Sequence, residues 1–237
     1  MFPYTGITQI FGALVLLYLA YRFWRIYQIE KYLVAKLFSC AFLFFSLIFL
    51  TLGIPSLFFI KAQAVWLAVM ILTCLFQSLA GATLGYIFFY LKFPQVPPKC
   101  GFFLIFLIEL LLVTPSFIHP PIYFFEPSGV VGWEIDPLVG ILRYLGILLF
   151  LIPIGIIYLV EAKKAAERRV KIRAYGLGLG FLGFTVVYLL DFIIFSIFDV
   201  DAKWTDISLG VCFLILLSMI LLTPKMIKHS ARAKFVK

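Results

Sequence analysis

The sequence predicts an all-α integral membrane protein: a bundle of seven transmembrane helices with its N-terminus outside and its C-terminus in the cytoplasm. Three observations predict this fold class. The first is composition: 64% of the 237 residues are hydrophobic and 13% are charged, whereas soluble domains are about 45–50% apolar and about 25% charged. The second is a series of seven apolar runs near the ~20 residues that a spanning helix needs. The third is the gathering of basic residues in alternate connections.

The seven runs form one membrane domain, 1–237, with no separate soluble domain. Pro55 is expected to end the second helix and Pro115 the fourth, because proline cannot continue a helix's hydrogen bonding. The third run is long and the fourth is short, which predicts tilt or an extended end. The predicted helices are 7–24, 36–54, 64–91, 101–117, 137–160, 173–198 and 205–223.

The first run is expected to stay in the protein as a helix. No basic residue precedes it, and no small-x-small cleavage site follows it before Arg22. A secretory signal peptide would carry both features.

The basic residues set the predicted orientation. Seventeen of the 20 lysines and arginines fall in the first, third and fifth connections and in the tail 225–237. The exceptions are Lys61, Lys203 and Arg143. Cytoplasmic loops carry the excess of basic residues, so these connections and the basic tail are predicted to be cytoplasmic in a multi-pass cell-membrane protein.

The net charge of +9 is therefore interpreted as a topology signal. The basic face is also expected to attract anionic lipid headgroups. Nucleic acid is not expected as a partner, because no soluble domain would present such a patch. The fifth connection is the predicted docking surface for a protein partner. Its basic residues are Lys163, Lys164, Arg168, Arg169, Lys171 and Arg173.

Three charged residues interrupt the apolar runs: Glu109, Arg143 and Asp191. A charge at the centre of a membrane helix costs at least about 2.5–3.5 kcal/mol, so such residues usually face a partner or a water-filled cavity. Counting 1.5 Å per residue places all three roughly 9–11 Å below the outer boundary. We predict a cluster in which Arg143 pairs with one or both acids. It is either a structural ion pair or the floor of an outward-facing ligand or proton site.

The largest outer loop, 118–136, is rich in proline and aromatic residues. His119, Tyr123 and Trp133 are its candidate contact residues. Three roles are open for the loop: a lid over an outward pocket, a docking surface for another subunit, or a segment lying in the lipid interface.

Glycines predict close helix packing, because small residues let helix backbones approach in lipid. Gly81 and Gly85 form a Gly-x-x-x-Gly pair in the third run, and four more glycines lie at the start of the sixth. Packing within the chain is the favoured interpretation, and homodimerisation is the alternative.

Catalysis, cofactors and a metal site are not expected. The two histidines, His119 and His229, lie outside the apolar runs, so membrane haem has no ligand pair. Zinc and di-iron sites lack ligands at usable spacing. The four cysteines show neither CxxC nor Cys–His spacing and are interpreted as small hydrophobic residues.

Four motifs suggest a family. They are GYIFFYLKFP after the third run, LLLVTPSFIHPPIYF at the end of the fourth, KKAAERRVKIR in the fifth connection and GLGLGFLGF in the sixth. Over about 100 residues, the chain resembles the N-terminal seven-helix sensory module of some bacterial and archaeal histidine kinases and related signalling proteins. That resemblance implies a sensor, with His119 near a polar position at the outer end of the fourth helix. The family's cytoplasmic output domain has no counterpart in the short tail, so a sensor of this kind is expected to signal through a separate protein.

Three functions are therefore open. The first is a non-catalytic, receptor-like sensor with an outward-facing pocket that acts through a partner. The second is an accessory subunit of a larger membrane complex or a homo-oligomer. The third, ranked last, is a small-solute transporter of 3+1+3 topology, for which broken helices near the midplane would be the better indication; only Pro153 interrupts the fifth run, and the first run has no counterpart.

Overall fold

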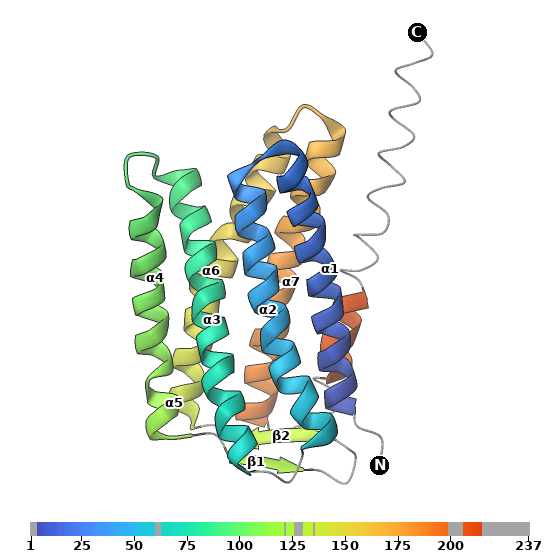
Figure 1. Ribbon diagram of the computed structural model, residues 1–237, viewed down its shortest axis with the longest axis vertical. Coiled ribbons are helices and arrows are strands. Elements are labelled where there is room, and N and C mark those ends of the chain that lie inside the picture. Colours follow the sequence, from blue (N-terminus) through green and yellow to red (C-terminus); the bar gives the residue numbers. More distant parts are fainter. Residues whose placement is uncertain are drawn as a thin grey trace.

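The computed structural model of this chain describes residues 4–59, 63–120, 122–125, 130–134, 136–198 and 206–214. The described part is mostly helical, and its long helices run side by side (Figure 1). The long helices are α1 (Tyr4–Glu30), α2 (Leu33–Phe58), α3 (Gln63–Lys92), α4 (Pro98–Val113), α6 (Pro137–Lys164) and α7 (Arg168–Phe198). A one-turn helix, α5 (Pro115–Ile118), follows α4, and residues 206–214 are also helical.

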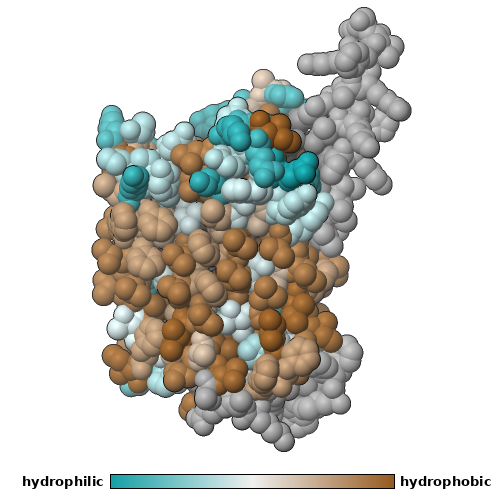
Figure 2. All heavy atoms as spheres, viewed as in Figure 1, coloured by the Kyte–Doolittle hydropathy of each residue, from teal (hydrophilic) through white to brown (hydrophobic). Residues whose placement is uncertain are grey.

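Four segments within the described residues are long and apolar enough to cross a membrane: Tyr4–Glu30, Leu33–Phe58, Val65–Lys92 and Pro98–Ile118. On the face shown in Figure 2, an apolar band covers the middle of the molecule, and hydrophilic residues gather at the end where α1 meets α2 and α3 meets α4. This distribution agrees with a protein embedded in a membrane. Helices α1, α2, α3, α6 and α7 cover the corresponding predicted runs and extend beyond them at one or both ends, α4 ends before the predicted residue 117, and only residues 206–214 of the seventh predicted helix are described.

Aromatic rings fill the core near the connection between α1 and α2. Phe38 of α2 is fully buried and lies against Phe23 of α1, Tyr158 of α6 and Phe181 of α7, with ring centroids 5.4–5.9 Å apart. These contacts join four helices in one apolar core. Buried aromatic area and ring geometry both stabilise such a cluster.

Of the two proline predictions, the one for Pro55 was wrong, and α4 does end next to Pro115. Helix α2 continues one turn beyond Pro55 to Phe58, because a proline near a helix end removes only one backbone hydrogen bond. Helix α4 ends at Val113, before Pro115, and Pro115 instead begins α5. The amide of Thr114 donates to the carbonyl oxygen of Leu111 at 3.3 Å, the acceptor that an N–H at position 115 would otherwise use.

The fold also departs from the all-α prediction in the loop 118–136. Strands β1 (Ile122–Phe125) and β2 (Val131–Glu134) form a two-stranded antiparallel sheet in which Tyr123 is opposite Trp133. Two short runs of β-branched and aromatic residues flank a Glu-Pro-Ser-Gly turn signal, a pattern typical of a hairpin. The hairpin lies at the end of the bundle that holds the start of α3 (Figure 1).

Candidate functional site

Glu109 is the buried acid around which the candidate site is built. Its side chain is 1% exposed and lies on α4, whose other residues from Gly101 to Val113 are all apolar. An ionised carboxylate in such surroundings carries a large desolvation cost unless it has partners. The groups around Glu109 therefore decide what the site can do.

Two glycines on neighbouring helices make room for this carboxyl group. A methyl group at Gly81 of α3 would come within 3.0 Å of Oε1, and one at Gly146 of α6 would come within 2.7 Å of Oε2. One turn away, Ile105 of α4 packs on Gly85 of α3. The predicted Gly-x-x-x-Gly face is thus used inside the chain, at the junction of α3, α4 and α6.

Further polar side chains are buried in the same helices. Gln77 of α3 lies beside the Glu109 carboxyl group, and Thr73 is one turn further along α3. Ser116 of α5 is also buried. The Gln77 side chain is a hydrogen-bonding neighbour of the Glu109 carboxyl group, whereas the hydroxyl oxygens of Thr73 and Ser116 have no hydrogen-bond partner among the described residues.

The predicted partners of Glu109 are placed by their helices only. Arg143 is three residues before Gly146 on α6, so the two share a face of that helix, and that face meets Glu109 at Gly146. Asp191 lies on α7, which packs against α6. The side chains of Arg143 and Asp191 lie outside the described part of the structure, so the three-residue charge cluster stays a prediction.

The hairpin packs against the bundle at Trp66 of α3. Tyr123 of β1 stacks on Trp66 of α3 with ring centroids 4.6 Å apart, and Trp66 is 3% exposed. Val131 of β2 joins the same apolar cluster. The contacts place Tyr123, one of the three predicted loop residues, at the end of α3.

A hydrogen-bonded junction holds β2 to two helices. The Thr5 hydroxyl donates to Oδ2 of Asp206 at 2.5 Å and accepts from the Val131 backbone N–H at 3.0 Å. Thr5 and Asp206 are both buried. The start of α1, the hairpin and the helical segment 206–214 are therefore joined at one point, which the sequence reasoning did not identify.

The other two predicted loop residues are less informative. His119 is exposed and follows the last residue of α5, with its backbone N–H donating to Pro115. Trp133 is placed by its strand register, and its side chain is outside the described residues.

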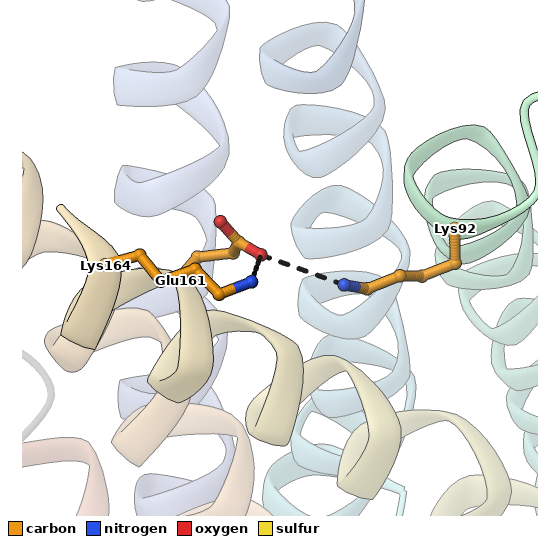
Figure 3. A network of polar contacts seen from close by, with 3 residues as sticks. All are labelled: Lys92, Glu161 and Lys164. Atoms are coloured by element: carbon orange, nitrogen blue, oxygen red, sulfur yellow. Dashed lines mark hydrogen bonds and ion pairs between the residues drawn. The ribbon is translucent and has the colours of Figure 1, made fainter.

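The predicted docking residues lie around the connection between α6 and α7. Lys163, Lys164, Arg168 and Lys171 are exposed, and the side chains of Arg169 and Arg173 are not described. Glu161 of α6 approaches two lysines, Lys164 at 3.5 Å and Lys92 at the end of α3 at 3.8 Å (Figure 3). The sequence did not predict the pairing of Glu161 with Lys92, because the two residues lie on helices that are far apart in sequence.

Within the described residues, no group of three or more His, Cys, Asp or Glu side chains is arranged to hold a metal ion. The four cysteines form no disulfide with one another; Cys74 is buried, Cys100 is exposed, and the other two are half-buried.

Comparison with known proteins finds no family model and no curated protein that matches this sequence. The resemblance to seven-helix sensory modules accordingly stays a prediction.

Proposed function

We propose that this chain is a seven-span membrane protein, N-terminus outside and C-terminus in the cytoplasm, that acts as a non-catalytic sensor through a separate partner protein. Two sets of contacts support the topology. Lys92 and Glu161 bring the predicted cytoplasmic ends of α3 and α6 together. Thr5, Val131 and Asp206 bring three predicted outer segments together.

The sensor role rests on one observation: the two helices that enclose Glu109 also form the ion pair at the opposite end. Gly81 and Lys92 are 11 residues apart on α3, and Gly146 and Glu161 are 15 residues apart on α6. At 1.5 Å per residue, the ion pair is roughly 16–22 Å from the carboxyl group along the helices. A change in charge or packing at Glu109 moves α3 relative to α6, and rigid helices carry that movement to the cytoplasmic surface.

The ion pair itself is exposed, and pairs of this kind contribute little stability. The position of the ion pair is what matters for a sensor. The pair lies at the same end of the bundle as the exposed basic residues Lys163, Lys164, Arg168 and Lys171. A partner with an acidic segment, or anionic headgroups, would bind this surface by charge complementarity.

The test measures the distance between the two cytoplasmic helix ends. Nitroxide labels are placed at Phe93→Cys and Lys163→Cys in a background with the four native cysteines replaced, and the protein is held in lipid nanodiscs. Glu109→Gln is expected to change the dipolar broadening between the labels. The matched control, Glu30→Gln, changes an exposed acid at the end of α1 and is expected to leave it unchanged.

Unchanged broadening in Glu109→Gln, in protein that is folded by circular dichroism, would contradict the sensor proposal. It would indicate that the junction around Glu109 is a rigid packing element.

An accessory subunit is the second candidate, and two glycines favour it. Gly176 and Gly183 are seven residues apart on one face of α7, and neither has another described group within 4 Å of an added methyl position. Small residues that share one helix face suit close packing by another membrane helix. Native mass measurement of gently solubilised protein distinguishes the candidates, because a lone monomer argues against an obligate subunit.

A further inference from the structure

Four buried polar side chains follow the seam between α3 and the α4–α5 segment. They are Thr73, Gln77, Glu109 and Ser116, each less than 5% exposed. Thr73, Gln77 and Gly81 recur every four residues and therefore share one face of α3. Gly81 contacts Glu109, so that face is the one turned toward α4.

The register of the two helices places these residues in order. Gly85 meets Ile105 and Gly81 meets Glu109, so a step of four residues backward on α3 corresponds to four residues forward on α4. Thr73 is then level with residue 117, next to Ser116. Met70, Cys74 and Val113 form a small buried apolar cluster between α3 and the end of α4. The polar side chains thus extend from Glu109 toward the hairpin end.

Three of these side chains have buried oxygen atoms that need hydrogen-bond partners. Glu109, Thr73 and Ser116 each carry at least one buried oxygen without a hydrogen-bond partner among the described residues. Buried oxygens are normally hydrogen-bonded to protein groups or to ordered water. Three residues beyond Ser116, the exposed imidazole of His119 stands at the end of the series.

We propose that Glu109 is a proton-binding site that exchanges with the outer aqueous phase along Ser116, Thr73 and Gln77. A proton from outer water forms an O–H bond with one carboxyl oxygen, the carboxylate becomes neutral, and no other bond changes. This names the stimulus of the sensor proposed above, external pH, and in that respect it rests on the proposed function. The binding site itself rests only on the contacts around Glu109.

The packing favours a proton over a metal cation. The glycine backbones of α3 and α6 lie close against both carboxyl oxygens, at distances that an added methyl group would clash with. Calcium takes six to eight oxygen ligands and magnesium an octahedron, and one carboxylate with neutral oxygens is a weak set for either. A proton needs one oxygen and no added volume.

Other titratable or charged groups on the packed helices must be considered. On α3 the nearest are Cys74, one turn from Gln77, and Tyr86, five residues from Gly81; on α4, residues 101–113 contain no other; on α6 they are Arg143 and Tyr144, whose side chains are not described. Asp191 on α7 is a further predicted neighbour. A guanidinium group beside Glu109 would keep its carboxyl group ionised, so the experiment includes a variant of Arg143.

The experiment is infrared difference spectroscopy of the full chain in nanodiscs, titrated with acid. A carboxylic C=O band is expected to appear as pH falls, to be absent in Glu109→Gln and to shift in frequency in Glu109→Asp. The control Glu161→Gln, at an exposed acid, retains it. If no band depends on Glu109, or if one appears only in Arg143→Met, Glu109 belongs to an ion pair and the proton site is overturned.

The route is tested in oriented proteoliposomes. Protonation of Glu109 is expected to follow a pH step outside, and to be slowed in Thr73→Val and Ser116→Ala without a shift of the titration midpoint. Protonation that follows only the inner pH overturns the route.

The two proposals fail separately. If the band titrates while the labels on α3 and α6 do not respond to external pH, the proton site stands and the sensor proposal fails. If the labels respond to Glu109→Gln and no band titrates, the sensor stands with a different stimulus.

Discussion

At the level of single residues, the buried carboxyl group of Glu109 accounts for the glycines that face it. A carboxyl group inside an apolar helix needs space and polar neighbours, and Gly81 and Gly146 leave that space on two other helices. The sequence predicted that Glu109 is buried and that Gly81 lies at a packing face. It did not predict that the two residues meet, because their contact depends on the register of three helices, which composition and spacing do not determine.

Gly146→Ala is expected to destabilise the protein by about 1–3 kcal/mol, the usual cost of overpacking, because the new methyl group would lie 2.7 Å from Oε2 of Glu109. Unfolding in mixed micelles measures this. The control is Gly176→Ala, where nothing described lies within 4 Å and alanine is expected to be neutral or to gain up to about 1 kcal/mol.

The same measurement on Gly146→Ala combined with Glu109→Ala identifies the cause. Removal of the carboxyl group is expected to relieve the added cost, giving non-additive free energies of unfolding. Additive effects would mean that the alanine clashes with something other than Glu109.

Thr5→Val is expected to cost about 1.5–3 kcal/mol, the range for hydrogen bonds to a charged group. The substitution keeps the shape but removes the donor to Asp206 and the acceptor for the Val131 N–H. Hydrogen exchange of β2 should accelerate as well. Thr8→Val, one turn along α1, where the threonine methyl group packs near Gly210, is the control and should leave exchange of β2 unchanged.

At the level of elements, the hairpin was the largest departure from the sequence prediction. Prolines and glycines in 118–136 indicated a loop, and the two short strands were hidden by their length of four residues each. The long helices were predictable because an apolar run of membrane length is a strong signal. Pro55 misled because a proline in the last turn does not end a helix.

Trp66 is the residue on which the hairpin depends. Trp66→Ala is expected to destabilise the protein by about 3–5 kcal/mol, as for a buried tryptophan, because it removes the ring stacked on Tyr123. Limited proteolysis should then cut within 122–134 faster. Trp24→Ala, at a 39% exposed tryptophan on α1, should leave the cutting rate unchanged; equal protection in Trp66→Ala would show that Thr5 alone holds the hairpin.

At the scale of the whole molecule, the charge pattern and the packing contacts divide the bundle into the same two ends. The exposed lysines and arginines described around the α6–α7 connection lie with the end of α3, which Lys92 joins to Glu161. The hairpin and the start of α1 lie at the other end (Figure 1). Which end faces the cytoplasm follows from the positive-inside rule and not from packing, because helices pack equally well in either orientation.

Two cysteines test the proposed orientation directly. Native Cys100 is exposed at the start of α4, on the predicted cytoplasmic side, and Ile122→Cys places a thiol at an exposed position of β1 on the predicted outer side. A membrane-impermeant maleimide is expected to label Cys100 in inside-out vesicles only. Cys100→Ala/Ile122→Cys should be labelled in right-side-out vesicles only, and detergent should make both sites reactive. The reverse pattern would place the basic face outside, and the proposed docking surface could not then contact a cytoplasmic partner.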